Sequence, residues 1–347
     1  MKDNALFFYQ TTRDFLTVYL IKQRGVSPNT VKSYREALNL LIEYVRETKN
    51  SPLKDISFQC ISRELIESFL QWLETERKCT ISTRNQRMSA MKSFLKYAAE
   101  KDKLLMALYL DVNGIPKKKD TKVHTIDFFS EAALEVILAQ PDKRKRNGQR
   151  DLFFLILMYD TGARAQEMLD LKVCDICMDR NNPYIVITGK GSKTRHVPIM
   201  QKTCRHFESY RHRFHPTEKA DEYLFYIDRK GNRTKMSIDN VEKFVARYGE
   251  KAHSESQEVP EHLYPHMLRH SRSMHLYRNG MPLPLVAEWL GHAKMETTRR
   301  FYANADTSMK KEAIDKATSD INPLYSNKYD IEWEDDDELL KQLYCLK

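Results

Sequence analysis

Hydrophobic residues recur at helical spacing throughout residues 1–115, where segments that alternate as strands do are scarce. The pattern predicts four helices in this region. One spans 12–22 and has Phe15, Val18 and Tyr19 on one face. The other three are a helix that opens at Ser27-Pro28 and buries Leu38, Leu41, Ile42 and Val45, a helix over 65–75, and a helix over 83–99 that buries Met88, Met91, Phe94 and Leu95.

Further helical patterns follow residue 127. Ser130 is a good cap for a helix that runs through 139. Residues 151–160 read DLFFLILMYD and are apolar nearly all round, which predicts a buried helix. Thr161-Gly162 then breaks this helix and starts another, which places Arg164 in the first turn, beside the break.

A hairpin and two further helices are predicted downstream. Residues 184–199 read YIVITGKGSKTRHVPI, in which two β-rich runs flank a turn of glycines and lysines. After residue 264 the helical spacing returns. Gly280 ends one helix, Pro282 opens the next, and Gly291 ends that one.

A basic linker separates the two regions. Residues 113–122 read NGIPKKKDTK, the composition of a flexible basic connection. The prediction is a mainly α fold with a small β-sheet, in which an all-helical N-terminal domain precedes a mixed α/β domain. Its parts are a helical domain at 1–115, a linker at 116–127, a second domain at 128–320 and an acidic tail at 321–347.

The charge of the chain indicates which kind of partner the protein binds. The net charge is +9, but seven acidic residues and no basic one lie between 330 and 338. Without these seven, the 57 basic residues outnumber the remaining 41 acidic ones by 16. A cationic body of this kind favours a polyanionic partner, and nucleic acid ahead of a membrane. Many soluble proteins are basic for other reasons, so charge alone does not decide the matter.

Composition also limits where the protein is expected to work. Hydrophobic residues make up 41% of the 347 positions and charged ones 30%, which is typical of a globular protein. The chain has no apolar run of spanning length and its first residues lack a signal-peptide layout, so we expect a cytoplasmic protein with no membrane partner. Six dispersed cysteines fit a reducing compartment.

Several side chains suited to phosphate chemistry fall on these elements. His266 and Arg269 are three residues apart and so share one helix face. Glu167 is placed to orient the guanidinium of Arg164, although an inconsequential surface pair is the alternative. The remaining candidates are Lys190 and Lys193 at the hairpin tip, His292 after Gly291, and Tyr302 on a third helical segment.

Basic residues also line the predicted helical domain and the linker. The candidate DNA contacts are Arg84, Arg87, Lys117, Lys118 and Lys119, with Lys193 of the hairpin tip as a sixth. In a four-helix unit such residues can clamp a duplex through its phosphates, which positions the protein without reading the base sequence. For any one of them, solvation of a helix face is the simpler interpretation.

The second domain resembles the catalytic domain of the tyrosine recombinases, the phage integrase and Xer-like family. The matching segments are YDTGARAQEML, ITGKGSKTRHVPI, HMLRHS, LGHAKMETT and the tyrosine in RRFYANAD, in the family's order between about 128 and 316. Each segment alone is weak, but five in register are specific. The helical first domain is similar to the family's core-binding domain in layout only.

The resemblance implies a role for each candidate. Arg164 and Arg269 would clamp the scissile phosphate, and Lys190, or less well Lys193, would be the general acid for the leaving 5′-oxygen. His266 would assist proton transfer, His292 would bind the phosphate, and Tyr302 would attack it to form a 3′-phosphotyrosyl link. A phenol has a pKa of about 10, so this nucleophile needs cationic surroundings. The resemblance implies no metal and no cofactor.

The tyrosine departs from the family's usual spacing by one position. The family places it nine residues after the histidine of its LGH motif, which here is Phe301, whereas Tyr302 lies at ten. The ANAD segment aligns if one residue is inserted before Tyr302, which is the preferred interpretation. The alternative is that Phe301 occupies the catalytic position and the chain is inactive.

The resemblance also implies partners: double-stranded recombination sites, a tetramer on two duplexes, and accessory DNA-bending or directionality proteins. Residues 335–346 could form an amphipathic helix that docks on a neighbouring protomer, whereas the acidic run could instead screen the DNA-binding face or be disordered. We predict a site-specific recombinase of a mobile element. The alternatives are a type IB topoisomerase, a Xer-like chromosome-dimer resolvase and a catalytically silent DNA-binding regulator.

Two further motifs have weaker interpretations. Cys174 and Cys177 form a CxxC and precede Cys204 and His206, so a zinc site is conceivable, but the second pair lacks zinc-finger spacing. The segment from Arg269 to Leu290 also resembles a helix-turn-helix, which would suggest a repressor. That hypothesis leaves Arg164, the hairpin and Tyr302 unexplained.

Overall fold

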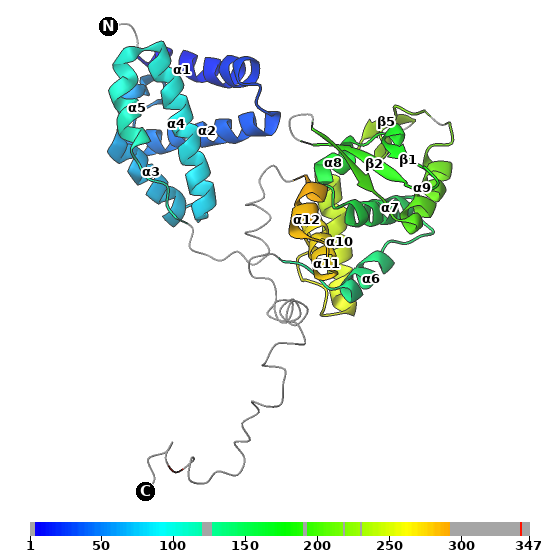
Figure 1. Ribbon diagram of the computed structural model, residues 1–347. Helices are drawn as coiled ribbons and strands as arrows, with labels where there is room; N and C mark the ends of the chain where they lie inside the picture. Colours follow the sequence, from blue (N-terminus) through cyan, green and yellow to red (C-terminus); the bar gives the residue numbers. More distant parts are fainter. Residues whose placement is uncertain are drawn as a thin grey trace, which may run out of the picture. The chain divides into compact units, whose positions relative to one another are not determined.

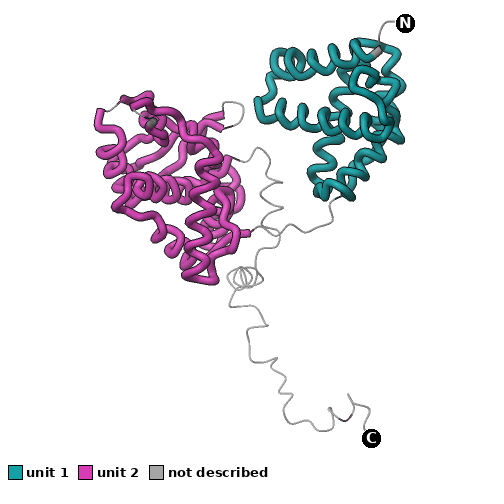
Figure 2. Tube along the Cα trace, turned by 180° about the vertical axis from the view of Figure 1, so that it is seen from behind, with its two compact units in different colours: residues 1–123 teal, residues 124–347 magenta. Residues whose placement is uncertain are grey.

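The computed structural model describes residues 4–119, 127–189, 193–217, 219–229, 231–291 and 341. The chain divides into two compact units, 1–123 and 124–347 (Figure 2). The described residues are mainly helical with two small sheets, which confirms the predicted fold class. Among them, no helix combines the length and the apolar character that a membrane span requires.

All the secondary-structure elements among the described residues of unit 1 are helices (Figure 1). Serine or threonine caps begin three of its helices: Ser27, Ser62 and Thr80 each accept a hydrogen bond from a backbone N–H three residues on. Its helices are α1 (Asn4–Asp14), a π-helix (Phe15–Gln23), α2 (Pro28–Lys49), α3 (Arg63–Thr75), α4 (Ile81–Lys101) and α5 (Met106–Asn113), with short 3-10 turns at Leu53–Asp55, Phe58–Cys60 and Lys103–Leu105.

The core of unit 1 is rich in aromatic rings. Phe8, Phe15 and Phe58 surround Phe94 of α4, with ring centroids 5.4 to 6.0 Å apart. The inward-facing residues predicted for α4 are all buried, as are Leu38, Leu41 and Val45 of α2, while Ile42 packs against the core from its edge. Helix α5 was not predicted, because it is short and follows α4 after a single turn.

Residues 12–22 are helical as predicted, but the type of helix and its buried face differ from the prediction. From Phe15 the helix follows π geometry, in which hydrogen bonds span five residues instead of four. This winding widens the turn, so the buried side chains are Phe15, Leu16 and Leu20, and Val18 is 37% exposed. An α-helical template therefore places Val18 on the wrong face.

The first part of the predicted linker packs on unit 1. Lys92 of α4 donates from Nζ to the carbonyls of Asn113 and Ile115, at 2.8 and 2.6 Å. Lys118 exchanges two backbone hydrogen bonds with the side chain of Asn85 and forms an ion pair with Glu74 at 2.9 Å. Residues 113–118 are thus fixed to α3 and α4, whereas 120–126 lie outside the described residues.

Unit 2 combines helices with two antiparallel sheets (Figure 1). The first sheet has the order β1-β2-β3 and the second is the hairpin β4-β5. The helices are α6 (Glu131–Ala139), α7 (Arg146–Thr161), α8 (Ala165–Asp170), α9 (Gln201–Phe214), α10 (Ile238–Glu255), α11 (Pro265–Arg278) and α12 (Leu283–Leu290); the strands are β1 (Ile176–Cys177), β2 (Tyr184–Thr188), β3 (Thr194–Pro198), β4 (Tyr226–Arg229) and β5 (Asn232–Lys235).

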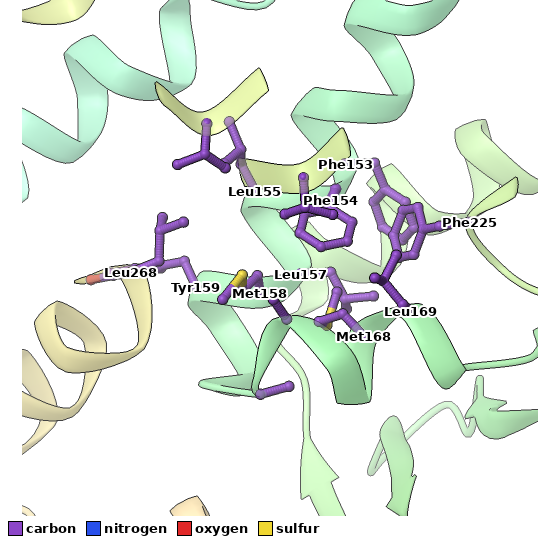
Figure 3. Close-up of a cluster of buried hydrophobic side chains, with 14 of the residues drawn as sticks. Phe153, Phe154, Leu155, Leu157, Met158, Tyr159, Met168, Leu169, Phe225 and Leu268 are labelled. Atoms are coloured by element: carbon purple, nitrogen blue, oxygen red, sulfur yellow. The ribbon is translucent and has the colours of Figure 1, made fainter. Parts of the chain in front are cut away.

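Helix α7 is the centre of the unit 2 core, as its apolar sequence predicted. Phe154, Leu155, Leu157 and Met158 are completely buried. Figure 3 shows these side chains with Met168 and Leu169 of α8, Phe225 before β4, and Leu268 of α11. The predicted hairpin is formed by β2 and β3, which pair antiparallel from Tyr184 opposite Pro198 to Thr188 opposite Thr194.

Two glycines in left-handed conformations end α7 and α12. Gly162 has φ 57° and Gly291 has φ 64°, the C-terminal geometry that favours glycine. The aromatic ring of Trp289 in α12 lies so close to Gly162 that an added Cβ would be 2.5 Å from its Cη2. The end of α7 and the last turn of α12 are therefore in direct contact.

A buried histidine holds the first described residues of unit 2 in place through the carbonyl of Phe129. His275 of α11 is bonded through Nε2 to the carbonyl of Phe129 at 2.9 Å and through Nδ1 to the hydroxyl of Tyr159 at 2.7 Å. The carbonyl can only accept, so Nε2 donates and Nδ1 accepts from Tyr159. Burial lowers the pKa of His275, although the Phe129 carbonyl and Glu131 oppose this shift.

We expect Gly162→Ala to lower the free energy of unfolding by roughly 2–4 kcal/mol, because it adds steric overlap to the strain of a left-handed alanine. The added methyl must displace the Trp289 ring. Gly280→Ala is the matched control, because Gly280 also has positive φ but has open space around it. Urea denaturation of both variants measures the difference; equal losses would rule out the Trp289 contact.

We expect the stability of unit 2 to fall as the pH drops below about 6.5, because the unfolded chain then protonates His275 more readily than the folded chain does. His206 and His266, whose pKa values are also lowered, contribute in the same direction. His275→Gln should therefore reduce the slope of unfolding free energy against pH, by at most about 1.4 kcal/mol per pH unit. Urea titrations at pH 7.0 and 5.5, followed by tryptophan fluorescence in a Trp72→Phe background, measure this slope; an unchanged slope contradicts the assignment.

Candidate active site

Arg164 is the cap of α8, two residues after the glycine that ends α7. Its side chain is 40% exposed, and its Nη1 donates to Oε1 of Glu167 at 2.7 Å. The guanidinium is thus held by a carboxylate and partly exposed to solvent. The predicted orientation of Arg164 by Glu167 is present in the structure.

Glu167 is shared by two arginines. Its carboxylate is only 6% exposed and also accepts bonds from Arg195 of β3, with Nη2 to Oε2 at 2.7 Å and Nη1 to Oε1 at 3.3 Å. The backbone N–H of Arg164 donates to Oε2 at 2.9 Å. Burial alone would raise the pKa of Glu167, but the hydrogen bonds from Arg195 and Arg164 lower it to about 2. The carboxylate is therefore ionised at any working pH.

Arg269 lies at the floor of the same region and is 1% exposed. Its Nη2 donates to the carbonyl of Leu290 at 2.7 Å, and its Nη1 donates to the carbonyl of Gly162. These acceptors are at the ends of α12 and α7, where carbonyls lack helical partners. Arg269 therefore joins three helices in addition to supplying positive charge.

His266 lies within the electrostatic range of both arginines. Burial of the ring, followed by the positive charges of Arg269 and Arg164, lowers the pKa of His266, and Glu167 opposes this shift. The residue as a whole is nevertheless exposed to solvent. The ring of His270, one turn further along α11, packs edge-on at 4.8 Å. A neutral imidazole next to two guanidiniums can accept a proton at neutral pH.

The hairpin closes just below its tip, where Gly189 donates to the carbonyl of Lys193 at 2.8 Å. Lys193 is exposed to solvent. Lys190 lies outside the described residues, as do His292, Phe301, Tyr302 and the predicted helix at 335–346 except for residue 341. The structure thus brings together Arg164, His266 and Arg269, and the proposed roles of the other residues remain predictions.

The candidate DNA contacts of unit 1 differ in their exposure. Arg84 is 7% exposed and lies 3.4 Å from Glu74, and Arg87 is half-buried with its Nη1 3.1 Å from Sγ of Cys79. Lys117, Lys118 and Lys119 are exposed, although Lys118 is paired with Glu74. Burial and pairing make Arg84 a structural residue in this conformation.

Sequence reasoning missed Arg195, because an arginine in a hairpin strand is usually solvated. The sequence signal that could have revealed it is the two-residue period of a strand. Val197 lies two residues further along the same strand and is fully buried, so Arg195 is on the same, inward face. The cysteines of the conceivable zinc site differ widely in exposure: Cys174 is exposed and Cys204 is buried. In the part of the chain that the structure describes, no three His, Cys, Asp or Glu side chains are grouped as metal ligands.

Known proteins resemble this chain in sequence and in fold. The sequence pattern of the phage integrase family matches residues 127–309, and that of the phage integrase N-terminal SAM-like domain matches 14–102. The Sinorhizobium fredii protein y4rC, described as an integrase or recombinase, is 29% identical over 96% of both chains. The tyrosine recombinase XerC of Chlamydia caviae is 27% identical over 86% of this chain and 96% of its own.

Two solved structures share the fold. The XerH site-specific recombinase, bound to palindromic difH substrate, has a TM-score of 0.63 and 20% identity over 85% of this chain and 82% of its own. The Tn1549 transposon integrase, bound to transposon right end DNA, has a TM-score of 0.65 and 16% identity over 88% of this chain and 98% of its own. With the family pattern covering more than half of the sequence, the chain belongs to the phage integrase family, that of the tyrosine recombinases.

Proposed function

We propose that this protein is a site-specific DNA recombinase that cuts and rejoins strands through a 3′-phosphotyrosyl intermediate. The observation that carries the proposal is the cluster at the end of α7: Arg164, which is paired with the ionised Glu167, and Arg269, which binds the Gly162 carbonyl, both lower the pKa of His266. Membership of the tyrosine recombinase family supports the same chemistry.

Phosphate binding falls to the two arginines. Arg164 is partly exposed and Glu167 is its partner among the described side chains, so its guanidinium can bind phosphate oxygens. Arg269 contributes positive charge from the floor of the site, where low exposure strengthens its field. Both charges stabilise the negative charge that accumulates on the phosphoryl oxygens during attack.

Two proton transfers accompany strand cleavage. The phenol oxygen of Tyr302 attacks phosphorus, its proton passes to His266, and the bond from phosphorus to the 5′-oxygen breaks. Lys190, with Lys193 as the poorer candidate, gives a proton to that leaving oxygen. His292 would hydrogen-bond a non-bridging oxygen. The neutral state of His266 at pH 7 supports its role as acceptor.

Strand exchange reverses the same steps. The 5′-hydroxyl of another strand attacks the phosphotyrosyl bond, releases Tyr302 and restores a phosphodiester. One such bond breaks for each that forms, so no nucleotide hydrolysis is needed. We propose that four protomers act on two duplexes, with accessory DNA-bending or directionality proteins deciding the outcome.

We favour a recombinase of a mobile element, since y4rC, which matches along nearly the whole chain, is described as an integrase or recombinase. A Xer-like chromosome-dimer resolvase is the second candidate, supported by the match to XerC. The two differ in substrate: a mobile-element recombinase acts at the ends of its element, and a resolvase acts at one chromosomal site, usually with a paired recombinase.

We expect the wild-type chain to form a denaturant-resistant adduct with nicked suicide substrates made from the element ends or flanking chromosomal DNA. Tyr302→Phe should abolish the adduct, because it removes the attacking oxygen. Gel electrophoresis in detergent measures it, with a mobility shift to verify binding.

The double variant Phe301→Tyr, Tyr302→Phe decides between the two spacings. It moves the hydroxyl to position 301, nine residues after His292, and should be inactive if Tyr302 is the nucleophile. A double variant that gains adduct would place the catalytic position at 301. Tight binding without an adduct in any variant would favour a DNA-binding regulator.

We expect cleavage to lose activity on the acidic side only below about pH 6.5, because His266 must be neutral to accept a proton and its pKa is lowered in the free protein. The pH profile of kcat/KM reports groups of the free enzyme and is the measurement to make. His266→Gln should remove this acidic limb. A limb centred above pH 6.5 would contradict the assignment.

A further inference from the structure

Arg195 occupies an inward position on the hairpin that carries the proposed general acid. It lies in β3 opposite Ile187 and two residues after Lys193. Its side chain is 14% exposed, although arginine is usually among the most exposed residues. An arginine held this far inside a small sheet requires partners that justify its desolvation.

The first partner is the carboxylate that holds Arg164. Arg195 makes a bidentate contact with Glu167, and both oxygens of that carboxylate also accept bonds from Arg164. One negative charge is therefore divided between two guanidiniums. Without Arg195, Glu167 would neutralise Arg164 more completely and leave less positive charge for a phosphate.

Arg195 also lies close to two glycines. An added Cβ at Gly291 would lie 3.1 Å from both Cδ and Nη1 of Arg195, and one at Gly189 would lie 3.7 Å from Nη1. Gly189 directly precedes Lys190, and Gly291 directly precedes His292. The Arg195 side chain thus lies beside the glycines that precede two proposed site residues. It is connected to a third, Arg164, through Glu167.

We propose that Arg195 is a positioning residue that ties the hairpin bearing Lys190 and Lys193 to the Arg164–Glu167 pair. The inference rests on the proposed recombinase function. Arg195 acts by fixing where the hairpin lysine meets the leaving 5′-oxygen and by sharing the charge of Glu167. Lysine cannot reproduce the planar two-point contact, so charge alone does not replace it.

The test is the single-turnover cleavage rate of Arg195→Gln on two suicide substrates. One has the natural 5′-oxygen leaving group, and the other has a bridging 5′-sulfur, which leaves without protonation. We expect Arg195→Gln to cleave the oxygen substrate about 100-fold more slowly than the wild type, since misplacement of a catalytic group by about 1 Å has an effect of this size. On the sulfur substrate the defect should shrink by at least about tenfold, because the general acid is no longer needed.

Arg233→Gln is the matched control. Arg233 lies in β5 of the same unit and donates to Glu222 at 2.7 Å, an arginine–glutamate pair remote in sequence from the site residues. It should cleave at the wild-type rate. Arg195→Lys should recover only part of the loss, and binding of intact substrate should change by less than about threefold in both Arg195 variants.

The outcomes separate this inference from the function on which it rests. Equal defects of Arg195→Gln on both substrates, or a rate equal to that of Arg233→Gln, would overturn the positioning role while the wild type still cleaves. If the wild type forms no adduct on any substrate, the recombinase proposal itself fails. Thermal unfolding verifies that the variants fold; if Arg195→Gln does not, the comparison of the two substrates is made with Arg195→Lys.

Discussion

A buried arginine determines how the helices of unit 2 meet. Arg269 is 1% exposed, and it is retained inside the protein because its guanidinium donates to backbone carbonyls at the ends of α7 and α12. Helix C-terminal carbonyls are natural acceptors for a cation, since they lack helical partners and carry partial negative charge. The chain therefore leaves both helices, at Gly162 and Gly291, beside the same positive charge.

This constraint makes the site and the fold hard to separate. Gly162 must be small for the Trp289 ring to approach, and it must adopt positive φ for α7 to end where Arg269 can reach its carbonyl. The next turn then delivers Arg164 as the cap of α8. Substitution of Arg269 would remove a proposed phosphate ligand and leave buried carbonyls unsatisfied, a cost of roughly 1–3 kcal/mol each. Loss of activity in such a variant would not identify a catalytic role by itself.

Local signals in the sequence predicted most of the scaffold. Cap residues such as Ser27 and Ser130, the apolar helix at 151–160, and the hairpin depend on neighbouring residues only, and the structure contains each of them. The family motifs predicted the cluster of Arg164 and His266, although they could not show that Arg269 also joins helix ends.

The missed features depend on contacts between distant residues or on winding that no simple period describes. Arg195 and Glu167 are 28 residues apart, and Tyr159 and His275 are 116 apart, so no sequence window contains either pair. The π-helix after Asp14 replaces the 3.6-residue period on which the expected face of Val18 rested. The hairpin β4-β5 has a mostly polar sequence, which does not alternate as an amphipathic strand does.

Burial also decides which basic residues of unit 1 can meet a DNA backbone. Arg84 and Lys118 share Glu74, and Lys92 is held by two carbonyls, so these cations stabilise unit 1 itself. Lys32 and Arg35 of α2 are exposed and, among the described residues, are in no ion pair. Because phosphate contacts require accessible charge, the α2 face is a better candidate for DNA contact than Arg84. The number of basic residues in a sequence overstates the charge that a duplex encounters wherever some of those residues hold the fold together.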